Sequence, residues 1–271
     1  MCFNKLFFCF VCLSILSVRM VFAVDIGTDT TINTDSTEIH NITDDNVTLT
    51  NNADIIKASG GVNATIFSDA AGTTIINNAN ATIGLTGNGD QTVMLQNIAN
   101  PTVINSGTIS SGDGQAIDIR GTTGAIIINN AGGVITARRS TIRCASTCTN
   151  PTITNSGKII ATDLGTAILL NISTGLILTN NAGGEIISNS GDQTIDLQDS
   201  GTFTNSGLIR ALNANGGLEL SDAAAVIKFN GTNTTVLLKD KGIVVGTISN
   251  SGDNAGSKLQ VQHGYGRSYM Y

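Results

Sequence analysis

The sequence predicts an all-β fold in which the chain winds as a single-stranded parallel β-helix. Three observations support this prediction: the composition, a repeat of nearly constant length, and three strand-like pieces in each repeat. Charged residues make up 13% of the chain and aromatic residues 4%, while 41% of the residues are hydrophobic. The apolar residues are mostly Ile, Val, Leu and Ala, and Asn, Thr, Ser and Gly separate them. This pattern is typical of short strands joined by tight turns.

An Asn-Asn-Ala or Asn-Ser-Gly triplet recurs along the chain, and each copy lies between two short apolar pieces. Successive copies are separated by 26, 28, 24, 26, 25 and 25 residues. A repeat of about 25 residues indicates a solenoid in which each repeat forms one coil. We therefore expect about eight coils of ~25 residues, counting a more divergent copy at Asn230. The seven clear copies begin at Asn51, Asn77, Asn105, Asn129, Asn155, Asn180 and Asn205.

Each repeat divides into three short strands. One has the form seen in Ala116-Ile117-Asp118-Ile119, a second runs into the Asn triplet, and a third leaves it. Pieces of two to four residues are too short for hairpins, so each is expected to pair in parallel with its equivalent one coil away. Alternation along the strands places Ile117 in the core and Asp118 on the opposite face.

We interpret the seven triplet asparagines as structural. A sharp corner favours residues that tolerate the left-handed backbone conformation, and Asn and Gly do so at the lowest cost. Equivalent corners stacked about 4.8 Å apart would also allow the amides of neighbouring coils to form a hydrogen-bonded ladder.

The N-terminus has the layout of a secretory signal peptide. Lys5 precedes an apolar run from Leu6 to Phe22, and Ala23 closes a small-residue cleavage site, so residues 1–23 are expected to be removed. A retained anchor is the alternative, although Arg19 interrupts the run. Residues 24–47 are expected to form a cap or a divergent first coil, and residues 48–271 the β-helix. No membrane span is expected after cleavage.

Two cysteines remain in the mature chain. Cys144 and Cys148 lie four residues apart, and a small-loop disulfide between them would suit an oxidising compartment. The alternative is a pair of small buried residues.

The leader, the low cysteine content and the Asn-Ser-Gly-x-Ile repeats together resemble the passenger domains of classical autotransporters, the type V secretion proteins. The resemblance begins near Thr48, and Gly256 to Tyr271 is similar to the segment that precedes the autochaperone region of many passengers. It implies a right-handed β-helix at the cell surface, in the outer membrane or outside the cell, with an adhesive or virulence role. It also implies a β-barrel translocator, which this sequence does not contain. A truncated gene, a separate partner barrel and a secreted solenoid exported by another route are all consistent with that difference.

Candidate catalytic and metal-binding groups are few. His40 and His263 are the only histidines, neither lies in a motif, and both are expected at the surface. No metal site and no cofactor are expected, because zinc sites require more His or Cys ligands. The net charge of −6 and the absence of a basic stripe argue against nucleic acid as a partner.

Carboxylates at one corner of the coils need separate consideration, because some β-helices act on polysaccharides. Arg138 and Arg139 fall at the matching corner between two of these carboxylates, and such an arrangement relieves repulsion between stacked acids. We therefore interpret the corner as a solvated charge ladder, with a weak Ca²⁺ site and a paired-carboxylate glycosidase as alternatives. The acids are Asp90, Asp113, Asp163 and Asp192.

The resulting hypothesis is a structural or adhesive surface module without catalysis, whose partner is a macromolecule of a host or cell surface. A carbohydrate-active β-helix enzyme and a non-functional autotransporter fragment are the alternatives.

Overall fold

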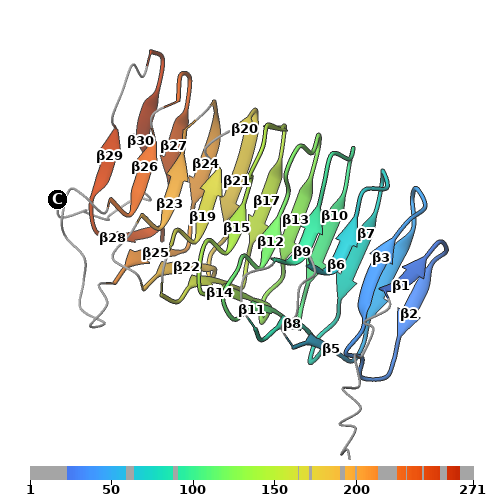
Figure 1. The fold of residues 1–271 in the computed structure, drawn as a ribbon. Coiled ribbons are helices and arrows are strands. Elements are labelled where there is room, and N and C mark those ends of the chain that lie inside the picture. The colour runs from blue at the N-terminus through green and yellow to red at the C-terminus, as the bar shows by residue number, and fades with distance from the viewer. Residues whose placement is uncertain are drawn as a thin grey trace, which may run out of the picture.

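The computed structural model describes residues 23–58, 64–87, 91–163, 165–170, 173–189, 193–198, 200–212, 225–229, 231–239, 241–250 and 255–262. Within these ranges every regular element is a β-strand, and the strands form three long sheets and one short sheet. The predicted right-handed parallel β-helix is confirmed, and Figure 1 shows its coils stacked along one axis from the blue N-terminal strands to the red C-terminal strands. No helix in this part of the chain has the length and apolar character needed to cross a membrane.

Sheet A contains one strand from each coil. This strand follows the corner whose length varies most between coils. Its ten strands are β1 (Ala23–Ile26), β3 (Ile39–Ile42), β6 (Ala64–Ser68), β9 (Gln91–Leu95), β12 (Ile117–Asp118), β15 (Ile142–Arg143), β19 (Ile168–Leu170), β23 (Ile195–Leu197), β26 (Ile227–Phe229) and β29 (Ile248–Asn250).

Sheet B contains the strands that run into the Asn triplets. Its ten strands are β2 (Thr30–Ile32), β4 (Thr48–Asn51), β7 (Thr74–Asn77), β10 (Thr102–Asn105), β13 (Ile126–Asn129), β17 (Thr152–Asn155), β21 (Leu176–Asn180), β24 (Gly201–Asn205), β27 (Thr235–Leu238) and β30 (Lys258–Val261).

Sheet C contains the strands that leave the triplets, and a two-stranded sheet lies at one further corner. The eight strands of sheet C are β5 (Asp54–Lys57), β8 (Thr82–Leu85), β11 (Thr108–Ser111), β14 (Val134–Ala137), β18 (Lys158–Ala161), β22 (Glu185–Ser188), β25 (Leu208–Ala211) and β28 (Ile243–Val245). The short sheet pairs β16 (Cys148–Thr149) with β20 (Ser173–Thr174).

Residues 24–47 continue the stack beyond the first Asn triplet. Strand β1 pairs with β3 in sheet A, β2 pairs with β4 in sheet B, and Ser36 forms an isolated bridge to Ile55 of sheet C. The leader predicted over residues 1–23 lies outside the described residues except for Ala23, which begins β1. Ten strands about 4.8 Å apart give a stack roughly 43 Å long.

The core consists of inward-facing side chains that lie above one another from coil to coil. In sheet A, Val93, Ile117 and Ile142 are register partners, and each is fully buried. In sheet B, Val103, Ile127 and Ile153 repeat this arrangement, as do Ile109, Ile135 and Ile159 in sheet C; the members of both rows are buried. Because the hydrophobic effect is roughly proportional to the buried apolar area, this continuous column is the main source of stability.

Candidate functional site

The seven triplet asparagines form a buried ladder at the corner between sheets B and C. The Asn51 Nδ2 donates to Asn77 Oδ1 at 2.9 Å, and each following amide donates to the next one at 2.8 or 2.9 Å. Each amide also donates to backbone carbonyls at the corner, as the Asn129 amide does to the Lys158 carbonyl at 3.1 Å. The ladder therefore satisfies polar groups that would be costly to bury unpaired. Its members are Asn51, Asn77, Asn105, Asn129, Asn155, Asn180 and Asn205.

The left-handed backbone conformation predicted for these asparagines is not observed. The non-glycine residues with a left-handed backbone are a different set, including Asn46, Asn97 and Asn150, and no ladder asparagine belongs to it. The ladder residues are the last residues of sheet B strands, with an extended backbone and an inward amide. They are present because the interior accepts a stacked amide, not because the backbone requires a positive φ.

The glycine that ends the Asn-Ser-Gly triplet is required by close approach of the backbone. A Cβ atom on Gly107 would lie 2.2 Å from the Ala81 carbonyl oxygen, and one on Gly157 would lie 2.2 Å from the Gly133 carbonyl oxygen. Any larger residue would push neighbouring coils apart.

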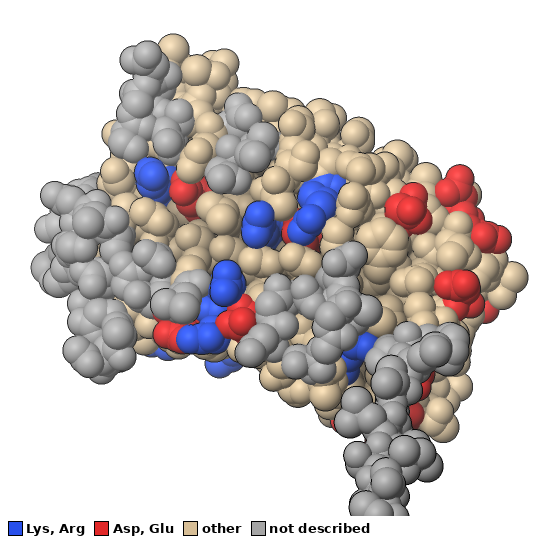
Figure 2. Space-filling model, viewed as in Figure 1, with Lys and Arg blue, Asp and Glu red and all other residues tan. Residues whose placement is uncertain are grey.

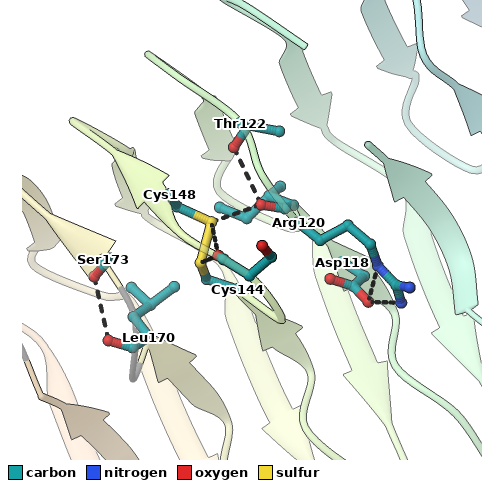
Figure 3. Close-up of a disulfide and its surroundings, with 9 residues drawn as sticks. Asp118, Arg120, Thr122, Cys144, Cys148, Leu170 and Ser173 are labelled. Carbon is teal, nitrogen blue, oxygen red and sulfur yellow. Dashed lines mark hydrogen bonds and ion pairs between the residues drawn. A yellow bond between two sulfur atoms is a disulfide. The ribbon is translucent and has the colours of Figure 1, made fainter. Parts of the chain in front are cut away.

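The cysteine pair forms a buried disulfide at another corner. Cys144 and Cys148 are bonded with their Cα atoms 6.2 Å apart, and both side chains are fully buried. In the preceding coil the Thr122 hydroxyl donates to the Ile119 carbonyl at 3.1 Å, and in the following coil Ser173 donates to Leu170 at 3.2 Å. Figure 3 shows the disulfide between these two hydroxyl contacts.

The disulfide coil has one more residue at this corner than its neighbours. Four positions separate Cys144 from Cys148, whereas Thr122 and Ser173 each reach a carbonyl three positions earlier. The covalent bond thus closes a longer turn at the place where shorter turns are closed by a hydroxyl.

The predicted charge ladder at the corner between sheets C and A is present in part. Arg138 Nη1 lies 2.7 Å from Asp113 Oδ1 of the preceding coil, and Arg138 Nε lies 2.7 Å from Asp163 Oδ2 of the following coil. Hydrogen bonds to Asp163 and then Asp113 raise the pKa of the Arg138 guanidinium. Asp90 and Asp192, which the sequence predicts at the same corner, lie outside the described residues. The two described acids are therefore occupied by one arginine.

A second set of charges lies on the outward side of sheet A. Asp118 is fully buried there and accepts hydrogen bonds from Arg120, including one from Nε at 3.1 Å. Three strands along, Asp196 accepts from Gln198 Nε2 at 3.0 Å and lies 4.0 Å from Lys228 Nζ. Figure 2 shows basic and acidic side chains next to each other in small groups on this side of the molecule. Among the described residues of this side, acidic and basic groups therefore lie close to one another.

The sequence suggested a surface position for His40, and this prediction is wrong. His40 occupies the inward row of sheet A, where its register partners are Val24 and Ile66, and it is 5% exposed. Burial lowers its pKa, and the nearby Glu38 opposes that shift. Its Nε2 lies 3.3 Å from Ser36 Oγ. The other positions of this inward row hold Ile or Val. The periodicity of the strand, and not the residue type, was therefore the signal that could have predicted the burial of His40. His263 lies outside the described residues.

Sheet B carries the most uniform outer surface of the described chain. From β4 to β27, two columns of outward side chains run along the stack without a charged residue. We call them together the Thr/Ile face. One column contains Thr48, Thr74, Thr102, Ile126, Thr152, Ile177, Thr202 and Thr235, and the other contains Thr50, Ile76, Ile104, Ile128, Thr154, Thr179, Thr204 and Leu237.

Within the described ranges, no group of three or more His, Cys, Asp or Glu side chains is arranged to hold a metal ion. Comparison with known proteins adds no name, since no family model, characterised protein or solved structure matches the chain.

Proposed function

We propose that the chain is an exported β-helical rod that acts as a structural or adhesive module at the cell surface or outside the cell. The observation that carries this proposal is the in-register repetition of the coils. Strand partners continue without a shift from β4 to β24 in sheet B and from β5 to β25 in sheet C. Each coil therefore presents equivalent surface positions, and many weak contacts to an extended partner can add together.

The disulfide supports the exported location. Cys144 and Cys148 are bonded within the core, and disulfides persist in oxidising compartments but are rare in the cytosol. The signal-like N-terminus and the resemblance to autotransporter passengers point the same way.

The distribution of charge supports binding rather than catalysis. A glycosidase needs one carboxylic acid that protonates the leaving group and one free carboxylate that activates water or acts as the nucleophile. Asp113 and Asp163 are both engaged by Arg138, and Asp118 is engaged by Arg120. The partner we propose is a macromolecule of a host or cell surface, bound without a cofactor.

Export is tested by expressing the gene with its own leader in a Gram-negative host. We expect the recovered chain to begin at Val24 and to be degraded when intact cells are treated with protease. A chain that stays in the cytoplasm with Met1 to Ala23 attached would contradict the proposal. Sequencing the DNA downstream of Tyr271 would separate a functional module from an autotransporter fragment.

Adhesion is tested separately with beads coated with the exported chain. We expect them to bind cells or extracellular matrix more strongly than beads coated with the Ile117→Asp variant, whose core is disrupted. Equal binding would contradict the adhesive role. Turnover of a polysaccharide that is abolished by Asp113→Asn would support the enzyme alternative instead.

A further inference from the structure

We propose that the Thr/Ile face binds crystalline water, so that the chain adsorbs to ice and restrains its growth. This inference goes beyond the adhesive role and does not depend on it. It rests on the chemistry of the face, its periodicity and its lack of charge.

The two columns repeat in two directions. Successive strands of a sheet lie about 4.8 Å apart, and side chains two residues apart on one strand lie about 6.6 Å apart. Register partners such as Thr102 with Thr74, and Thr154 with Ile128, show that this two-dimensional array continues across coils without a slip. The inter-strand spacing is close to the repeat between water oxygens along the a axis of hexagonal ice, and the spacing along the strand approaches the c-axis repeat.

The extent of the array is sufficient for cooperative binding. Eight strands from β4 to β27 give a face about 34 Å long at the spacing of parallel strands. A single hydroxyl exchanges one water contact for another and gains little. Ten of the sixteen side chains in this periodic array carry a hydroxyl, and together they can hold a layer of water in one arrangement.

The side chains of the face combine a methyl group with a hydroxyl group. The β-branched Thr side chain has few χ1 rotamers, so its hydroxyl is held in a restricted direction above the sheet. The Ile side chains present apolar surface between the hydroxyls, and Ile177 is 53% exposed. No charged group in the two described columns holds water in a hydration shell. The water molecules next to this surface therefore form hydrogen bonds mainly with one another.

Neutrality distinguishes this face from the other two. The outward row of sheet C holds Lys158 paired with Glu185 at 3.4 Å, and that of sheet A holds Asp118 and Lys228. Charged groups orient water around themselves in patterns that do not match a crystal. Crystalline polysaccharides are a poorer match, because no aromatic side chain lies in either column to stack on a sugar ring.

The test is the growth of single ice crystals in solutions of the exported chain, observed in a nanolitre osmometer. We expect faceted crystals and a gap between the melting and freezing temperatures that widens with protein concentration. Thr154→Lys, at the centre of the face, should narrow the gap several-fold. Thr136→Lys, on the outward side of sheet C next to Ser110 and Ile160, is the matched control and should leave the gap unchanged.

Circular dichroism at the osmometry temperature establishes that both variants are folded. If Thr154→Lys is not folded, Thr154→Ser replaces it, because it keeps the hydroxyl, removes the methyl and should narrow the gap by a smaller amount. Round, unrestrained crystals with the parent chain would overturn the proposal. So would equal losses from Thr154→Lys and Thr136→Lys. A parent that shows no gap but sediments as a dimer, which Thr154→Lys dissociates, would assign the face to self-association.

Discussion

The central coils and the N-terminal coils differ in which side chains they place in the interior. Around Ile117 the inward row of sheet A is entirely apolar, and each member is fully buried. At the N-terminal end the same row contains His40, and the equivalent inward corner of sheet C contains the almost fully buried Lys57. Val24, the N-terminal member of the row, is 43% exposed. Within the described inward row of sheet A, a titratable side chain is therefore found only near the N-terminal end of the stack.

The surface charge also differs between the N-terminal end and the centre of the stack. Of the 20 acidic residues, seven lie between Asp25 and Asp54. Figure 2 shows acidic side chains gathered at the end where Figure 1 places the N-terminal strands. Charge at a sheet edge hinders pairing with other chains, which suits a terminal coil and would be unfavourable in the middle of a stack.

The largest effect is expected from placing a carboxylate in the central row. Ile117→Asp should lower the free energy of unfolding by several kcal/mol, because it leaves an unpaired charge in a fully buried position. Denaturant melts followed by circular dichroism measure the loss. Val24→Asp is the matched control in the same row, and its effect should be much smaller because that site is partly exposed. Similar losses at both sites would remove the distinction between central and terminal coils.

The second effect concerns the asparagine ladder. Asn129→Ala should cost about 1–3 kcal/mol, because the amide of Asn105 loses its acceptor and the Lys158 carbonyl loses a donor inside the corner. Asn52→Ala provides the comparison, since Asn52 belongs to an exposed row outside the ladder and donates to Asn33 Oδ1. A chemical-denaturation series on the two variants is sufficient. An Asn52 variant as unstable as the Asn129 variant would show that burial does not set the cost.

The third effect concerns the disulfide corner. Cys148→Ser should cost up to about 2 kcal/mol, the value expected for closing so short a loop in the unfolded chain. The added hydroxyl offsets part of this loss, because Ser173 closes the equivalent turn of the next coil by hydrogen bonding. Thermal melts with and without reductant check the prediction. Reductant should destabilise the parent and leave the variant unchanged, and a parent insensitive to complete reduction would contradict the stabilising role.

The smallest effect is a pH dependence that originates near the N-terminal end of the stack. Burial holds the pKa of folded His40 below its ordinary value of 6.5, so the unfolded chain binds the proton more readily. The resulting stability is present above pH 6.5 and is lost as the pH falls from there through the lower folded value. Melts between pH 8 and pH 5 should show this decline. His40→Leu should weaken it, and an unchanged slope in that variant would show that other groups cause the decline.

Much of the architecture could be predicted from the sequence because a solenoid repeats one local rule. The 25-residue spacing, the Asn triplets and Ile/Val alternation were sufficient to predict a parallel β-helix and the inward position of Ile117. Residue type alone was less informative. Asn suggested a left-handed backbone that the ladder residues do not have, and His40 suggested the surface although its register partners place it in the core.

The sequence by itself determined the coil length, the corner at which each asparagine lies, and the proximity of Cys144 and Cys148, since these depend on spacing along the chain. Only the tertiary structure decided which side chains from different coils meet. The contact of Arg138 with acids from two other coils, and the alignment of sixteen side chains into the Thr/Ile face, depend on the exact register between strands. A one-residue shift in that register would exchange the inner and outer sides of a strand, so spacing along the chain predicts these surfaces only once the pairing is known.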